Sequence, residues 1–253
     1  MLINIKKAKQ EFKRYVENYN PKDEKIKIKI DHIERVAEIS KKIAQNLKLS
    51  EEEIKLAELI GLLHDIGRFE QIRIYNTFSD KDSINHGEFA VKILFEDGLI
   101  RKFIETDKYD KIIKLAIINH NRTYIEEGLT ERELLYAKII RDADKTDIYS
   151  VLISANKKTI WGKDDLSNEK ISDEIYREYI EDKRIDYRQR KTCVDTLVCH
   201  FNYVFDLNFK STKQIIKENK YIDKLYKRFK FEDKETMERY NNIYILAKQE
   251  LGE

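Results

Sequence analysis

The chain has 253 residues, of which 41% are hydrophobic, and this is enough to bury the core of one large domain or of a domain with an appendage. Charged residues make up 38% of the sequence, but 49 basic residues nearly balance 47 acidic ones, so the formal charge is only +2. This balance excludes a broad electrostatic surface for nucleic acid or an anionic membrane, although a local basic pocket for a small anion stays compatible with it.

The scarcity of turn-forming residues favours a mainly helical fold. Only one proline and seven glycines occur, while leucine, isoleucine, lysine and glutamate recur at helical spacing, so we expect an all-α fold with little or no strand. Cys193 and Cys199 form neither a CxxC motif nor a disulfide framework, which indicates a reduced setting. With no signal peptide and no apolar run of membrane-spanning length, we expect a cytoplasmic protein.

In the first part of the chain, apolar residues at three- and four-residue steps predict six helices. Pro21 ends the first of them, and Ser50 and Thr130 each begin a capping box. The helix after Ser50 is apolar on most sides and should be central, and Gly67 should end it before a loop of mixed polarity. The expected ranges are residues 2–19, 30–47, 50–63, 83–96, 109–120 and 130–151.

The character of the sequence changes after Trp161, where charge and tyrosine become dense. Helices are expected near residues 171–181, 188–208, 211–229 and 233–250. No linker requires a second autonomous domain, so we interpret residues 151–253 as a helical appendage packed on residues 1–150.

Four of the five histidines lie between positions 32 and 120, each on or beside an expected buried helix face. His120 continues the apolar stripe of its helix, and Asp144 shares a face with Ile148. Because burying an isolated charge costs several kcal/mol, a carboxylate on such a stripe must be paired or bound to a metal. His64 and its neighbour Asp65 are rotated by about 100° from each other on a helix, so they point at different parts of one cleft.

Histidine and aspartate side chains together are suitable ligands for a divalent metal. Imidazole and carboxylate fit manganese, iron, cobalt, nickel or zinc, with magnesium as a further candidate, and a bridging aspartate can hold two ions about 3.5–4 Å apart. Such ions activate water and neutralise charge on a phosphoryl oxygen. The sequence therefore predicts one or two divalent metal ions per chain.

The order of these residues resembles the H…HD…D signature of the HD superfamily of metal-dependent phosphohydrolases. His32 comes first, His64 and Asp65 follow within LLHDIGR, and Asp144 lies within RDADKTD. The resemblance covers residues 30–150 and implies an all-helical HD-domain bundle in which these four residues bind one metal.

Two further histidines are similar to those of the binuclear branch, which includes HD-GYP cyclic-dinucleotide phosphodiesterases and a bacterial dinucleoside-polyphosphate hydrolase family. His86 lies within NHGEFAV and His120 within IINHNR. The resemblance implies that Asp65 bridges to a second metal held by His86 and His120. The alternative for His86 is a structural role at the exposed start of a helix, near Asp82 and Ser83.

The sequence departs from several subfamilies at the residues that define them. It has no GYP tripeptide after the HD pair, and Asn121 stands where a double histidine would be expected of an HD-GYP phosphodiesterase. The ED pair of the ppGpp hydrolases is missing from a matching context, and dNTP triphosphohydrolases usually have longer, more basic chains. The expected substrate is therefore a small phosphate ester or anhydride, a nucleotide or nucleotide-derived molecule.

Several basic residues close to these ligands in the sequence are suited to bind a phosphate group. Arg68 follows the HD pair, Lys145 lies within RDADKTD, and Arg35 lies on the helix of the first histidine. Because a guanidinium matches phosphate oxygens bidentately, we predict catalytic roles for Asp65, Arg68 and Lys145, with Arg35 as a further candidate. For Arg68 the alternative is a cation at a helix C-terminus.

Two other residues each have two interpretations. Glu58 is placed either to orient a ligand imidazole or to form a structural ion pair. His200 lies in the aromatic stretch VCHFNYVFDLNF, which we interpret as a core helix of the appendage, with a substrate lid as the alternative. The late tyrosines are expected to pack helices rather than to stack on a base.

These observations predict a metal-dependent phosphohydrolase of the phosphomonoesterase or phosphodiesterase type, with no membrane or nucleic-acid partner. Its oligomeric state is left open. Two alternatives remain. Some HD-superfamily members use the same ligand set to hold a diiron centre that activates dioxygen, and a non-catalytic nucleotide sensor would bind at this site without turnover.

Overall fold

A computed structural model describes residues 2–253 as helices joined by loops, with no strand among these residues. The predicted all-α fold class is thereby confirmed. The chain divides into two compact units, Met1–Asp147 and Ile148–Glu253, close to the boundary expected at residue 150. That the second unit packs on the first stays a prediction, and the two units are described separately below. In the described part of the chain, no helix is long and apolar enough to cross a membrane.

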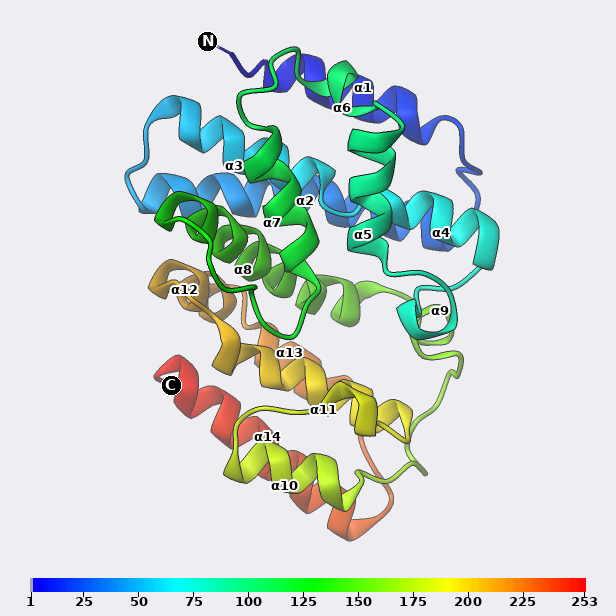
Figure 1. Cartoon of the computed structure of the whole chain (residues 1–253). Coiled ribbons are helices and arrows are strands. Elements are labelled where there is room, and N and C mark those ends of the chain that lie inside the picture. The colour runs from blue at the N-terminus through cyan, green and yellow to red at the C-terminus, as the bar shows by residue number, and fades with distance from the viewer. Residues whose placement is uncertain (1) are drawn as a thin grey trace. The chain divides into compact units, whose positions relative to one another are not determined.

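In the first unit the helices α2 and α3 lie side by side, and the other helices surround them (Figure 1). A 3-10 turn at Asp80–Asp82 precedes α5, a π-helical turn at Lys92–Glu96 follows it, and α5 contacts both α4 and α7. The helices are α1 (Ile5–Val16), α2 (Glu24–Asn46), α3 (Glu51–Leu63), α4 (Gly67–Tyr75), α5 (His86–Val91), α6 (Ile100–Phe103), α7 (Asp110–His120) and α8 (Glu131–Ser154), whose residues from Ile148 onward are assigned to the second unit.

Helix α3 is the central helix of this unit, as its composition predicts. Every residue from Leu56 to Leu63 is buried. The capping box also forms: Glu53 N donates to Ser50 Oγ at 3.4 Å, and Ser50 N donates to a Glu53 carboxylate oxygen at 3.3 Å. A second box forms at the start of α8 between Thr130 and Glu133.

Several expected boundaries in this unit are wrong; α1, for example, ends at Val16 instead of residue 19, and α5 begins at His86 instead of residue 83. Asn4 caps α1 with its side chain, so α1 begins later than residue 2. Asp23 caps α2, which starts six residues before residue 30, because the Lys-Ile alternation ahead of Ile30 hides the helical period. The loop expected after Gly67 is helix α4, and Gly67 begins this helix instead of ending the previous one.

Gly61 allows α2 and α3 to approach each other closely. A Cβ atom at this position would lie 2.7 Å from Ala37 Cα, a backbone atom that cannot move aside. Gly61→Ala is therefore expected to destabilise the protein by about 1–3 kcal/mol through overpacking and to weaken metal binding, since the two helices carry His32 and lead to His64. Urea unfolding and metal titration measure both effects. Lys42→Ala, at an exposed position of α2, is the control, and equal stability of the two variants would contradict this account.

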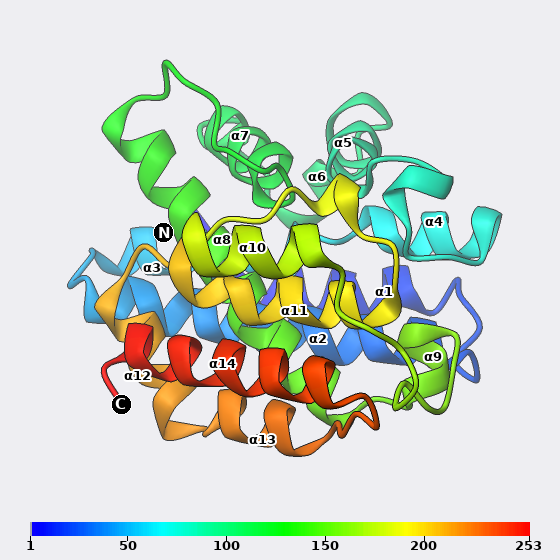
Figure 2. The ribbon, with the colours of Figure 1, turned by 90° about the horizontal axis from the view of Figure 1, so that it is seen from below.

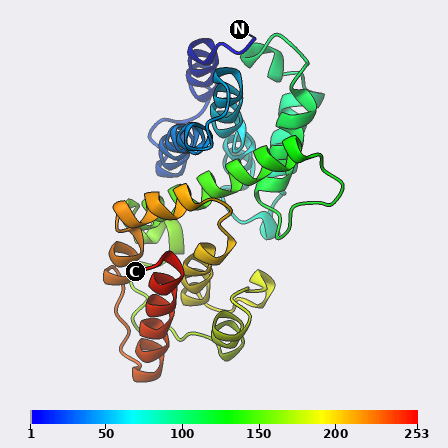
Figure 3. The same ribbon diagram turned by 90° about the vertical axis from the view of Figure 1, so that its left-hand side faces the viewer.

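The second unit has a core of its own. Helices α11 and α14 contact each other, and α14 lies beside α13 (Figures 2 and 3). Tyr179 and Tyr240 are fully buried in this core, and the Tyr226 ring stacks on those of Tyr240 and Tyr244, so the expected packing role of the tyrosines is confirmed. The helices are α9 (Lys157–Trp161), α10 (Asp173–Glu181), α11 (Cys193–Phe201), α12 (Lys210–Glu218), α13 (Tyr221–Lys227) and α14 (Lys234–Leu251).

Two expected long helices of this unit are shorter in the structure. The range 188–208 contains α11 flanked by the 3-10 turns Tyr187–Gln189 and Asn202–Asp206. The range 211–229 is broken into α12 and α13 at Lys220, whose φ of 53° is left-handed and cannot continue a helix. The stretch around His200 does form a core helix, as expected, and both cysteines are free.

His200 should make the second unit sensitive to acid. Burial, and then the charge of Arg190, lower the pKa of His200 to about 4 from an ordinary 6.5. Between these values the unfolded chain binds more protons than the folded one, so the free energy of unfolding falls as pH falls from 6.5 towards 4. The slope is at most about 1.4 kcal/mol per pH unit, and partial exposure of the ring reduces it.

The measurement is urea unfolding of the wild type and of His200→Phe across this pH range. The other histidines titrate equally in both proteins, so their contributions cancel in the difference. We expect the free energy of unfolding to fall less steeply with acid in the variant. Parallel pH profiles would contradict the assignment.

Candidate metal centre

Five segments of the first unit bring the six candidate ligands together. His32 lies on α2, His64 and Asp65 lie in the turn between α3 and α4, and His86 is the first residue of α5. The other two, His120 and Asp144, lie at the end of α7 and in the middle of α8. Five of the six are buried, and the side chain of Asp144 is 16% exposed.

One group of ligand atoms surrounds Oδ2 of Asp65. This oxygen lies 3.6 Å from Nε2 of His32 and 3.7 Å from Nε2 of His64. Asp144 Oδ1 lies 3.1 Å and 3.6 Å from the same two nitrogens. Atoms of His32, His64 and Asp144 are all within 4.8 Å of one another, which is the spacing of ligands around one ion.

A second group surrounds the other oxygen of the same carboxylate. Asp65 Oδ1 lies 3.4 Å from Nε2 of His86 and 3.7 Å from Nε2 of His120. The two imidazole nitrogens are 2.9 Å apart. Asp65 therefore has one oxygen near each pair of histidines, and His64 also lies within 4.8 Å of ligand atoms of Asp65 and His120. A bridging role for Asp65 fits this arrangement and stays a prediction.

Two of the histidines are oriented by backbone carbonyls. His64 Nδ1 lies 2.8 Å from the carbonyl oxygen of Gly61, and His120 Nδ1 lies 2.5 Å from that of Ile117. A carbonyl oxygen only accepts, so Nδ1 carries the proton in both rings. The neutral imidazole then directs the lone pair of Nε2 to the centre, as metal ligation requires.

The other two histidines are oriented by carboxylates that the sequence analysis did not single out. His32 Nδ1 donates to Asp147 Oδ2 at 2.7 Å, and His86 Nδ1 donates to Asp80 Oδ2 at 2.6 Å. Asp147 lies one helical turn after Asp144 on α8, so its spacing was a usable signal. Asp80 begins a short 3-10 turn, where no helical periodicity points to it.

The buried polar atoms at the centre fit a divalent cation. His64 Nε2 and Asp65 Oδ1 are both buried without a hydrogen-bond partner. An unpaired buried polar atom is costly, and each of these is a lone-pair donor pointing at a shared centre. The four imidazoles and two carboxylates form the mixed nitrogen and oxygen set that first-row divalent metals prefer.

Two of the four imidazoles have a lowered affinity for protons. Burial lowers the pKa of His64, and burial together with the Arg68 guanidinium lowers the pKa of His86 to about 3. Burial also lowers the pKa of His32, but its interactions with the carboxylates of Asp144 and Asp147 outweigh this and raise it. His64 and His86 are therefore neutral at physiological pH, the form that binds a metal.

The two carboxylates of the centre stay ionised. Burial raises the pKa of Asp65, but the charge of Lys29, together with smaller contributions from the surrounding imidazoles, outweighs it and holds that pKa well below the usual range. Burial likewise raises the pKa of Asp144, while His32 and His64 hold it well below its ordinary value. Both groups therefore provide anionic oxygens to a cation.

The comparison with known families agrees with this geometry. A model described as the HD domain matches residues 30–149. These residues are an HD domain. HD domains belong to a superfamily of metal-dependent hydrolases, and all six candidate ligands lie within the match. No curated protein and no solved structure matches the chain at a significant level.

Arg68 of the HD domain lies beside the second group of ligands. It is in the first turn of α4, so the alternative of a cation at a helix C-terminus is wrong. Its Nη1 donates to Gln71, to the carbonyl of Phe78 and to Asp80 at 2.6–2.9 Å, and its Nη2 lies 3.3 Å from Nε2 of His86. Arg68 thus holds the loop that orients His86, and a contact with phosphate stays a prediction.

The loop before α5 is held from two sides. Asn121, which takes the place of a second histidine after His120, donates to Asp80 Oδ2 at 3.2 Å and to Asn85 Oδ1 at 2.9 Å. Asn85 caps α5 by accepting from the N–H groups of residues 87 and 88. His86 is therefore not needed as the cap, and it is 6% exposed and faces His120.

The remaining candidate cations differ in position. Arg35 donates to both oxygens of Asp147, at 2.6 Å and 3.0 Å, and so supports the aspartate that orients His32. Lys145 is buried on α8 directly after Asp144, at 7% exposure. Its role at a phosphate stays a prediction.

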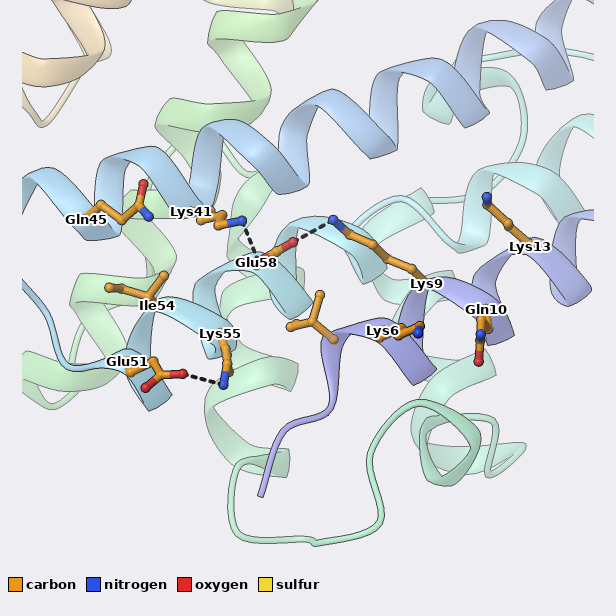
Figure 4. Close-up of a pocket in the computed structure, with 11 residues that line it drawn as sticks. Lys6, Lys9, Gln10, Lys13, Lys41, Gln45, Glu51, Ile54, Lys55 and Glu58 are labelled. Atoms are coloured by element: carbon orange, nitrogen blue, oxygen red, sulfur yellow. Dashed lines mark hydrogen bonds and ion pairs between the residues drawn. The ribbon is translucent and has the colours of Figure 1, made fainter. Parts of the chain in front are cut away.

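Glu58 forms the structural ion pair, the second of its two interpretations. Its carboxylate lies 2.7 Å from the Lys9 ammonium and 3.6 Å from that of Lys41. It does not orient His64, because Nδ1 of that ring donates to the carbonyl oxygen of Gly61. Figure 4 shows Glu58 between these lysines in a cavity of about 680 Å³. None of the six candidate ligands lines this cavity.

Asp147 is expected to raise metal affinity through His32. In Asp147→Asn the side chain keeps its shape but loses the negative charge that makes the imidazole a stronger ligand, so metal affinity should fall about 10–100-fold. Metal titration followed by calorimetry measures this loss. Lys42→Ala, on the same helix as His32 but exposed, should leave the affinity unchanged. An unaltered dissociation constant in Asp147→Asn would contradict the role.

Proposed function

We propose that this protein is a phosphohydrolase that uses two divalent metal ions to cleave an ester or anhydride bond in a small phosphorylated molecule. The observation that carries the proposal is the position of Asp65, whose Oδ2 lies 3.6–3.7 Å from Nε2 of His32 and His64 and whose Oδ1 lies 3.4–3.7 Å from Nε2 of His86 and His120. Paired metal ions about 3.5–4 Å apart are a recurring arrangement in phosphate hydrolysis, where they clamp the attacking and leaving oxygens.

Each ligand has a defined part in this proposal. His32, His64 and Asp144 would hold one ion, His86 and His120 the other, and Asp65 would bridge them. Bound metal ions would supply Lewis-acid activation of water and would neutralise charge on the phosphoryl group. The bridging carboxylate and the four oriented imidazoles keep these positions fixed before substrate arrives, so little reorganisation is needed during reaction.

Arg68 is the guanidinium best placed to stabilise charge on the substrate. Its Nε lies 3.7 Å from Asp65 Oδ1, and its side chain is 12% exposed. Arg35, in contrast, is engaged with Asp147. We propose a nucleotide or a nucleotide-derived molecule as the substrate, on the resemblance of the six-residue set to the binuclear branch of the HD superfamily.

The test combines metal analysis with a substrate screen. The purified protein is analysed for bound metal and then incubated with nucleotides, dinucleoside polyphosphates and simple phosphate esters in the presence of Mn²⁺ or Fe²⁺. We expect phosphate release that depends on the metal and is lost in His64→Ala. Glu34→Ala, an exposed substitution on α2, serves as the control.

Two results would contradict the proposal. One is the absence of hydrolysis by the metal-loaded protein across the whole screen. The other is oxygen consumption by an iron-loaded sample without phosphate release, which would indicate the diiron oxygenase alternative.

A further inference from the structure

Lys29 brings a positive charge directly to the bridging carboxylate. It lies on α2 one turn before His32, and its ammonium is 2.7 Å from Asp65 Oδ2. The Lys29 side chain is 15% exposed, so it is mostly buried but can still be reached by a ligand from solvent. The Phe78 ring lies 5.4 Å from the same ammonium and supports it through a cation–π contact.

The guanidinium groups near the centre are bound to protein groups over most of their donors. Arg68 donates to Gln71, to a carbonyl and to Asp80, and Arg35 donates to both oxygens of Asp147. Lys29 differs because it donates a hydrogen bond to a candidate metal ligand, Asp65, at 2.7 Å, whereas Arg68 only approaches this residue, with its Nε 3.7 Å from Oδ1. A dication bound to Asp65 Oδ2 would compete with the ammonium for this oxygen, since both are cations that need the same lone pairs.

We infer that Lys29 is a phosphate-binding residue of this centre, an assignment that rests on the proposed function. If Asp65 were engaged by a metal, the ammonium would lose this partner, and its three donors would need another anionic group. A phosphoryl oxygen of the substrate is such a partner, because an ammonium binds phosphate as a compact point charge. Lys29 would then help to select anionic substrates, although it is not part of the HD sequence motif.

A purely structural role for Lys29 has a different consequence. If the ammonium only neutralises Asp65, its removal frees a ligand oxygen and leaves the phosphate site intact. Metal affinity would then rise or stay constant, and affinity for phosphate would not change. The affinity for phosphate therefore distinguishes the two roles, and it can be measured without turnover.

The experiment uses the metal-loaded full chain and inorganic phosphate as the probe. In Lys29→Gln we expect metal content to be retained and the dissociation constant for phosphate, measured by calorimetry, to rise about 10-fold or more, as for loss of one charge-assisted hydrogen bond. The KM for a substrate found in the screen should rise in parallel. Lys29→Arg should restore part of both, and Lys27→Gln, at an exposed position of the same helix, should change neither.

The possible outcomes separate this inference from the proposed function. Unchanged phosphate binding and KM in metal-loaded Lys29→Gln would overturn the role of Lys29 while leaving the hydrolase intact. Weaker phosphate binding in a protein that hydrolyses none of the screened substrates would support Lys29 and contradict the hydrolase. Loss of metal from Lys29→Gln would overturn the inference, because it would make the ammonium a support of the metal ligands.

Discussion

Asp65→Ala is expected to abolish binding of both metal ions and to reduce phosphate release by at least about 100-fold. Removing a residue that only orients a ligand typically costs 10–100-fold in metal affinity or activity, so removal of a ligand shared by two ions should cost no less. The structural reason is that each oxygen of Asp65 faces a different pair of imidazoles. Metal analysis and phosphate-release assays on the same preparations measure the two losses.

A second variant separates this effect from misfolding. Asp65→Asn keeps the shape of the buried side chain but lacks the anionic charge, so it should retain the helical circular dichroism of the wild type and still lose metal. Asp31→Ala removes an exposed carboxylate of α2 and should retain both ions. Retention of two metal ions by folded Asp65→Asn would show that Asp65 is not the bridge.

His120→Ala is expected to lower bound metal from about two ions to about one per chain. The group formed by His32, His64, Asp144 and Asp65 Oδ2 does not include His120, so it should keep its ion. The other group would retain one imidazole and one carboxylate oxygen, which is too few ligands for firm binding. Metal analysis after dialysis gives the stoichiometry.

The activity of His120→Ala then reports how many ions the reaction needs. Loss of hydrolysis with one ion retained would assign an essential role to the second metal, whereas residual hydrolysis would indicate a reaction that runs on one. A wild-type protein that binds only one ion, with no change in His120→Ala, would contradict the binuclear proposal and make His86 and His120 structural.

Local sequence signals predicted much of the fold because their causes are local. The capping boxes at Ser50 and Thr130 form as expected, since each needs only residues three apart. The continuous apolar run before His64 correctly predicts a buried central helix. Gly67 was wrongly predicted to end a helix. Its lack of a side chain instead allows α5 to approach, since a Cβ atom here would lie 2.7 Å from backbone atoms of α5, and this contact involves a distant segment of the chain.

For the candidate site, too, some features could be predicted from the sequence and others only from the tertiary structure. The sequence by itself determined the helical class, because helical periodicity indicates which face of each helix is buried, and the resemblance of its histidine and aspartate order to the HD signature named the candidate ligands. Only the tertiary structure decided that Asp65 faces two histidine pairs and that Lys29, 36 residues away in the chain, lies against it. Periodicity says which face of a helix is buried, but the partner across that face is set by packing between helices, which leaves no local pattern in the sequence.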